Sequence, residues 1–118
     1  DKKTFVVTRG IDRCAWIYPM SEWNLIQKEL NQLSSLSKTN RIFLRNHLRH
    51  ANILKFDSQG RFVLPQSLID YSSITKDVTI IGVLNKIEIW NPNLLRKIDQ
   101  SDEIDDQSYE QLSERVNI

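Results

Sequence analysis

Hydrophobic and polar positions follow two different periods along this chain of 118 residues. Residues 4–10 (TFVVTRG) and 14–18 (CAWIY) are rich in β-branched and aromatic residues, which predicts two strands joined by a short turn. After Pro19 the apolar residues recur at helical spacing, and this series consists of Trp23, Ile26, Leu30 and Leu33. A second helical pattern runs from about Arg41 to His50. The N-terminal half therefore predicts a strand pair followed by two helices.

The C-terminal half contains a third pattern and then a second strand pair. Residues 53–68 (ILKFDSQGRFVLPQSL) place two apolar runs on either side of a polar knot, which is typical of a hairpin, and Pro65 can begin a short helix. Residues 77–83 and 86–90 predict the second strand pair, and a helix begins near Leu94. The remaining tail has only the pattern of a marginal helix.

The two strand pairs form an internal repeat. When the chain is shifted along itself, Phe5 falls on Val78 and Pro19 falls on Pro92, so that strand, turn, strand, proline and helix follow in the same order. In the second copy a hairpin precedes this unit. By the same shift, the matching hairpin of the first copy lies about 16 residues before Asp1, so we expect the encoded protein to carry such a stretch upstream.

Composition narrows the possible classes of protein. A chain that is 40% hydrophobic and 26% charged is globular rather than disordered. The single cysteine, Cys14, excludes an intramolecular disulfide and a cysteine-based zinc site. No apolar run approaches the roughly 18 residues of a membrane span, and the start has no secretory pattern. We therefore expect a cytoplasmic protein without a membrane partner.

Charge is distributed unevenly along the chain. Residues 1–98 hold 15 Lys and Arg against 8 Asp and Glu, a balance of +7, whereas residues 99–118 hold Arg115 against seven acids, a balance of −6. A basic body suits a polyanion such as nucleic acid, but it is also compatible with an ordinary solvated surface. We expect the acidic tail to be mobile and to oppose nucleic-acid binding.

The polar knot at residues 57–61 (DSQGR) has two interpretations. Gly60 can supply the left-handed backbone that a short turn requires. In the first interpretation, Asp57 caps the turn and Arg61 is solvated or paired with it. In the second, two such hairpins interleave, Asp and Arg from opposing copies order each other, and the guanidinium grips a phosphate or a guanine edge. The repeat favours the second interpretation.

The flanks of the polar knot carry further expectations. Lys55 should remain in water beside the turn, where it could contact a phosphate. The alternate apolar residues are expected to point into a core, and they are Phe56, Phe62 and Leu64.

Other polar residues admit both a functional and a structural interpretation, and we favour the structural one. Arg41, Arg45 and Arg49 share a helix face that could follow phosphates, but such a stripe is more often a solvated face. His47 and His50 could share a metal ion, yet no carboxylate or thiol stands near them in the sequence.

An enzyme is not expected. The chain has three glycines in all, no phosphate-binding glycine loop, and no nucleophile motif with a paired histidine. The aromatic residues Trp16, Trp23 and Trp90 are expected to anchor a core or an interface, and Cys14 is expected to be a small buried residue. We expect no cofactor and no metal.

Three blocks together resemble the MraZ family of bacterial transcriptional regulators: FVVTRGIDRCAWIYP, DSQGRFVLPQSL and IIGVLNKIEIWNP. The resemblance extends from Lys3 to Lys97. It implies a mixed α+β fold in which two pseudo-symmetric SpoVT-AbrB-type units, built from swapped hairpins and short helices, form one subunit. Related antitoxins of the AbrB type typically have single, dimeric units, and the tandem repeat argues against them.

The resemblance also implies a function. Such subunits assemble into homo-oligomeric rings on direct repeats in double-stranded DNA, near a cell-division and cell-wall gene cluster that includes their own promoter. Repression in the nucleoid is the expected activity. The paired D-x-x-x-R motifs contact DNA, and by position the second motif comprises Asp57, Arg61 and the turn residue Gly60, with Lys55 beside it. The first motif has no position in this sequence. The alternative is a ring-forming assembly or protein-interaction module without direct DNA binding.

The resemblance and the repeat divide the chain into four segments. Residues 1–20 are the remainder of the first unit, and residues 21–50 are a helical linker. Residues 51–94 are the second unit, and residues 95–118 are the start of a helix followed by the acidic tail.

Overall fold

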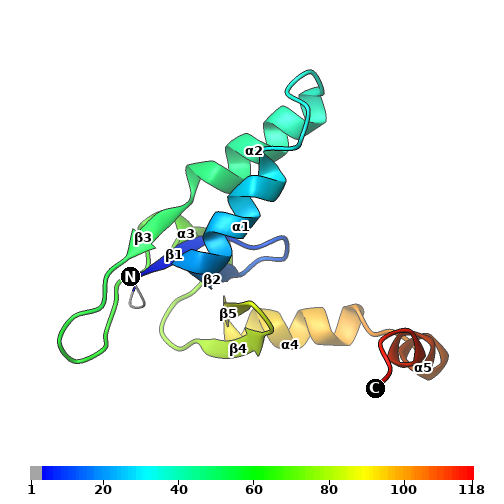
Figure 1. The fold of residues 1–118 in the computed structure, drawn as a ribbon. Coiled ribbons are helices and arrows are strands. Elements are labelled where there is room, and N and C mark those ends of the chain that lie inside the picture. Colours follow the sequence, from blue (N-terminus) through cyan, green and yellow to red (C-terminus); the bar gives the residue numbers. More distant parts are fainter. Residues whose placement is uncertain (1–3) are drawn as a thin grey trace.

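The computed structural model describes residues 4–118 and shows a mixed α+β chain (Figure 1), as predicted. The strands are β1 (Phe5–Arg9), β2 (Ala15–Pro19), β3 (Asn52–Leu54), β4 (Thr79–Val83) and β5 (Lys86–Trp90). The helices are α1 (Met20–Leu30), α2 (Lys38–Arg49), α3 (Gln66–Ser72), α4 (Pro92–Ser101) and α5 (Asp106–Arg115).

The strands form one antiparallel sheet in the order β3-β1-β2-β5-β4. The two predicted strand pairs are β1-β2 and β4-β5, and they meet where β2 pairs with β5 and Trp16 lies opposite Glu88. This arrangement places the two copies of the repeat back to back in a single sheet. β3, which follows the helices in the chain, returns to pair with β1.

Prolines mark the passage from strand to helix in both copies of the repeat. Pro19 ends β2 and occupies the N-cap position of α1. In the second copy, Pro92 is the first residue of α4, where its missing N–H is not needed. The side-chain oxygen of Asn91 caps this helix by accepting hydrogen bonds from the backbone N–H groups of Asn93 at 2.8 Å and Leu94 at 3.3 Å.

The sheet has a hydrophobic cluster on each face, because successive residues of a strand point to opposite sides. Val7 belongs to the larger cluster, whose buried members are Val7, Ala15, Ile17, Leu54, Leu68 and Ile89. Its neighbour Val6 packs instead with Tyr18 and with Trp23 of α1. Trp23, Trp90 and Cys14 are buried, which confirms their predicted place in the core.

The predicted hairpin at residues 53–68 is only partly a hairpin. Its incoming arm is the short strand β3, but residues 55–65 are irregular and the returning arm forms no strand in the described part of the chain. This segment projects beyond the sheet, where the returning arm has no third strand to pair with, and an isolated two-stranded ribbon is only marginally stable in water. The helix predicted at Pro65 is confirmed as α3.

The aromatic residues of this segment also depart in part from the prediction. Phe62 and Leu64 are partly buried and pack against the larger cluster, as expected. Phe56 was expected in the core, but its side chain is 38% exposed. It instead makes edge-to-face contacts with Phe5 and Phe62, with ring centroids 5.3 and 5.2 Å apart.

The helices extend from the sheet in two directions. Figure 1 shows α1 and α2 as a paired helical arm on one side, whereas α4 leads away from the sheet to α5 at the C-terminal end. The predicted marginal helix of the tail is therefore present as α5. Within residues 4–118, none of the helices combines the length and apolar character needed to cross a membrane.

Candidate nucleic-acid interface

The segment between β3 and α3, residues 55–65, is here named the Asp57 loop. Its turn is closed by two backbone hydrogen bonds: the N–H of Asp57 donates to the carbonyl of Arg61 at 2.8 Å, and the N–H of Gly60 donates to the carbonyl of Asp57 at 3.1 Å. Gly60 has a φ of +78°, which confirms the predicted left-handed turn residue.

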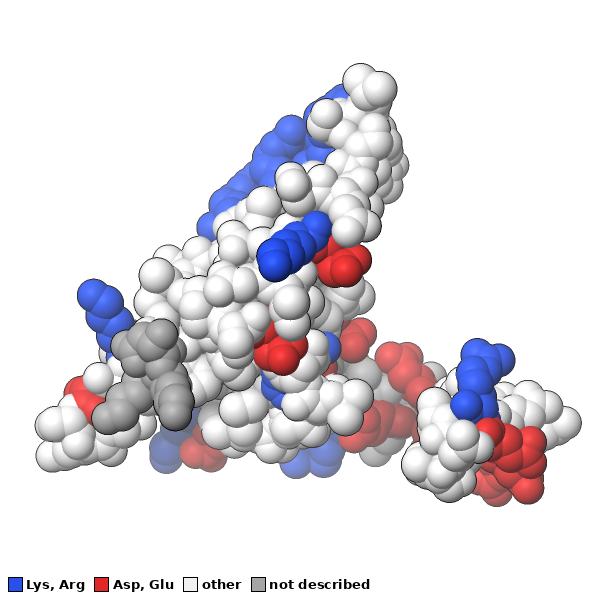
Figure 2. All heavy atoms as spheres, in the orientation of Figure 1, with Lys and Arg blue, Asp and Glu red and all other residues white. Residues whose placement is uncertain are grey.

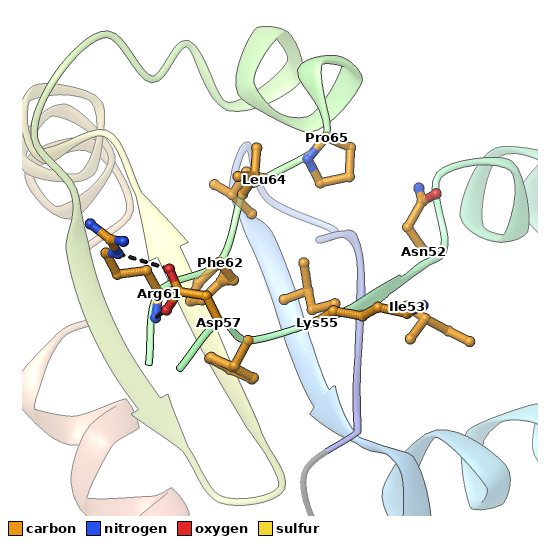
Figure 3. A pocket seen from close by; sticks show the side chains of 11 residues that line it. Asn52, Ile53, Lys55, Asp57, Arg61, Phe62, Leu64 and Pro65 are labelled. Carbon is orange, nitrogen blue, oxygen red and sulfur yellow. Dashed lines mark hydrogen bonds and ion pairs between the residues drawn. The ribbon is translucent and has the colours of Figure 1, made fainter. Parts of the chain in front are cut away.

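The Asp57 carboxylate organises the turn (Figure 3). Its Oδ1 accepts hydrogen bonds from the backbone N–H groups of Gln59 at 2.9 Å and Arg61 at 2.8 Å, and its Oδ2 accepts one from Arg61 Nε at 2.9 Å. These bonds lower the pKa of Asp57, and the backbone N–H of Arg61 has the largest effect. Asp57 therefore orders the arginine of its own loop, and this pair does not require an opposing hairpin.

The geometry leaves most of the Arg61 guanidinium free. Only Nε is used by Asp57, and no other residue among 4–118 accepts a hydrogen bond from the two terminal nitrogens. The Arg61 side chain is 71% exposed. The carboxylate thus holds one edge of the planar group, and the other edge can donate to a phosphate or to the acceptors of a guanine.

The two arms of the Asp57 loop enclose an open groove of about 780 Å³. Figure 3 shows side chains from both arms around it, including Phe62 and Leu64 from the returning arm. Lys55 lies on the incoming arm and is exposed, as predicted. The structure thus brings Lys55, Asp57, Gly60 and Arg61 together in one loop.

The other polar candidates lie elsewhere. Arg41, Arg45 and Arg49 are exposed on the helical arm, where Figure 2 shows basic side chains gathered along one side. His47 is buried and stacks on Phe43 with ring centroids 5.6 Å apart, and burial lowers its pKa. Within residues 4–118, no three His, Cys, Asp or Glu residues come together as a metal site would require.

Sequence reasoning missed a polar contact across the centre of the sheet. The Glu88 carboxylate accepts hydrogen bonds from the indole N–H groups of Trp16 at 2.9 Å and Trp90 at 3.0 Å. The only signal was that residues 88 and 90 share one face of a predicted strand. Burial and the charge of Glu88 raise the pKa of the Cys14 thiol to about 12, so this cysteine is a poor nucleophile.

A second missed contact holds the turn between β1 and β2. The guanidinium groups of Arg9 and Arg13 lie over the Tyr71 ring at 4.3 and 4.8 Å from its centroid. The Tyr71 hydroxyl donates a hydrogen bond to the carbonyl of Gly10 at 3.0 Å. These two arginines are therefore engaged by α3, unlike Arg61.

Comparisons with known proteins agree on one family. The family model described as "MraZ protein, putative antitoxin-like" matches residues 1–46 and again residues 47–117. A protein named "Transcriptional regulator MraZ" from Clostridium tetani is 37% identical over 98% of this chain and 78% of its own length. A relative of the same name from Natranaerobius thermophilus is 39% identical over 95% of this chain and 76% of its own length, and one from Pediococcus pentosaceus is 45% identical over 74% of this chain. With two successive matches to one family model and relatives that align over nearly all of its residues, this chain belongs to the MraZ family.

Proposed function

We propose that this protein is a sequence-specific DNA-binding regulator of transcription that contacts double-stranded DNA through the Asp57 loop. The observation that carries the proposal is the exposed Arg61 guanidinium, which Asp57 orients while its outer donors stay free. The names of the relatives, which describe transcriptional regulators, support the same function.

Each residue of the loop has a distinct role in this proposal. Arg61 supplies the planar fork of donors that distinguishes a guanine edge from other bases or grips a phosphate. Lys55 adds a nearby cation that contacts phosphate without reading the sequence. Asp57 and Gly60 set the direction in which Arg61 projects, because they hold the turn.

We further propose that several subunits act together as a ring on direct repeats. Each copy would contribute one or more Asp57 loops, and individually weak contacts would add through multivalency. The groove between the arms is suited to an interleaving loop from a pseudo-symmetric unit, as in swapped hairpins. On this proposal residues 51–94 form the second such unit. The target would be a cell-division and cell-wall gene cluster with the protein's own promoter, repressed in the nucleoid.

A second candidate function is assembly alone. Ile53 and Val63, from the two arms of the loop, are 59% and 85% exposed, and such apolar positions suit protein contacts. In this alternative the Asp57–Arg61 pair only stabilises a turn, and the ring recruits other proteins without touching DNA.

Replacing Arg61 separates the two functions. Arg61→Ala in the full-length protein should nearly abolish binding to duplex DNA from its own promoter region, because each bidentate base contact is worth ~1–3 kcal/mol and the loss is repeated in every subunit. Arg61→Lys should recover only part of the binding, since lysine lacks the fork. The measurement is a band-shift titration at fixed salt, with the melting temperature taken on the same sample.

The control is Arg96→Ala, which removes the same charge from an exposed position on α4. It should leave DNA binding close to the unmodified protein. A clear fall in melting temperature for Arg61→Ala, with DNA affinity unchanged, would favour the assembly function instead.

A further inference from the structure

Helix α2 carries a row of cations without acidic neighbours. Arg41, Arg45 and Arg49 repeat at intervals of four residues, all are exposed, and α2 contains no Asp or Glu. Figure 2 shows basic side chains in a row along this arm. Within residues 4–118 the one ion pair joins Asp57 and Arg61, so these three cations have no acidic partner there.

Helix α5 carries the opposite charge at the same spacing. Asp106, Glu110 and Glu114 also repeat at intervals of four residues and are exposed. Because the rise of an α-helix is about 1.5 Å per residue, successive charges in both rows lie about 6 Å apart along their axes. Two helices placed side by side can therefore bring all three pairs together.

Helix α5 also presents an apolar face that is not covered. Tyr109, Leu112 and Val116 lie on one side of the helix and are 63%, 49% and 61% exposed. A helix of ten residues is marginal in water unless one face packs against something. Figure 1 places α5 at the far end of the chain from α2, so the missing partner is not the helical arm of the same subunit.

The helical arm offers an apolar groove beside its cations. Leu44 and Leu48 of α2 and Leu30 of α1 line a hollow of about 190 Å³. Arg41 precedes Leu44 by three residues and Arg45 precedes Leu48 by three, so each cation borders the groove on the helix surface. Apolar contact and charge pairing are thus available along one side of the arm.

We propose that α5 of one subunit docks along α2 of a second copy of this chain. Tyr109, Leu112 and Val116 cover the groove, and the acidic row of α5 pairs with the basic row of α2. The charge complementarity and the shared spacing of the two rows identify the occupant. This interface is independent of the Asp57 loop and does not depend on the proposed function.

Disulfide trapping tests the proposal, because the middle members of the two rows meet whichever way the helices run. One copy carries Arg45→Cys and the other carries Glu110→Cys with a tag that changes its size. Mild oxidation of the mixed full-length proteins should give a covalent heterodimer on a denaturing gel. Native Cys14 is buried and does not compete. The control replaces Arg45→Cys by Lys76→Cys, an exposed position between α3 and β4, and should give no such band.

Charge reversal provides the second measurement. Arg41→Glu with Arg49→Glu in the Arg45→Cys copy should reduce the heterodimer to the control level. Adding Asp106→Arg with Glu114→Arg to the Glu110→Cys copy should restore it. A heterodimer yield equal to the Lys76→Cys control, or one that charge reversal leaves unchanged, overturns the proposal. So does a result in which reversing the α2 row weakens duplex DNA binding while α5 is never trapped, because the row would then serve phosphates.

Discussion

At the scale of single residues, one carboxylate accounts for the geometry of the Asp57 loop. Asp57 accepts two backbone N–H groups and one guanidinium N–H, so turn and side chain are held by the same group. The two interpretations of the sequence were presented as alternatives, but they are compatible. The pair that caps the turn is also what leaves the outer donors of Arg61 exposed.

Gly60→Ala tests how far the backbone of this turn matters. No atom lies within 4 Å of the position that a Cβ would take, so the substitution adds no clash. It does force an L-residue to hold a φ of +78°, which costs about 1–2 kcal/mol. We expect a lower melting temperature and weaker DNA binding, measured by thermal unfolding and band shift.

The matched control is Gly82→Ala, because its Cβ also meets nothing within 4 Å and its φ is not positive. Gly82→Ala should be nearly neutral. Equal destabilisation by the two substitutions would show that the left-handed conformation of Gly60 is not the cause.

At the scale of elements, the junction between β2 and β5 joins the two copies of the repeat. Glu88 of β5 accepts the indole N–H of Trp16 from β2 and of Trp90 from its own strand. Lys86 lies over the Trp16 ring, 4.7 Å from its centroid. A polar contact thus supplements the strand ladder at the place where the two units meet.

Glu88→Ala should weaken this junction. It leaves two partly or fully buried indole donors without their acceptor, and each such loss costs about 1–3 kcal/mol. Glu88→Gln keeps one acceptor oxygen and should recover part of the stability. Urea unfolding measures both, with Glu29→Ala at an exposed site of α1 as the control. A Glu88→Ala protein as stable as the control would mean that the strand ladder alone holds the units together.

At the scale of the whole molecule, the sheet ends in two open edges. β3 and β4 are the outer strands, and exposed apolar residues lie on or beside them: Ile53 at 59%, Ile80 at 61% and Leu84 at 107%. Short sheets with such edges need partners. Light scattering at micromolar concentration should therefore give a mass several times 13.9 kDa. A particle of the monomer mass would contradict the expected oligomer.

The acidic tail belongs to the same scale because its charge acts on the entire surface. Helix α4 ends at Ser101, so removing residues 102–118 leaves the sheet and α4 intact. We expect the shortened protein to fold normally and to bind DNA more tightly at low salt, because six acids are removed and only Arg115 is lost with them. Band shifts at two salt concentrations measure the effect.

A tail in which these acids are replaced by their amides separates charge from bulk. It should behave like the shortened protein at low salt. DNA binding that is unchanged or weaker after either change would show that the tail does not oppose the nucleic acid by charge.

Several features were determined by the sequence alone because their causes are local. Strand and helix patterns differ in period, and Pro19 and Pro92 interrupt the chain wherever they stand, so the element order and the repeat could be predicted. The left-handed turn at Gly60 could be predicted for the same reason, since only glycine adopts it without strain.

Other features were decided only by the tertiary structure. The order of the strands, with β3 beside β1 and β2 beside β5, depends on which apolar faces can be buried together across long stretches of chain. Phe56 stayed at the surface because its loop projects beyond the sheet, and Glu88 found two tryptophans because the strand register placed them there. Pairing between distant segments is selected by burial and hydrogen-bond geometry in three dimensions, and residue spacing along the chain does not encode it.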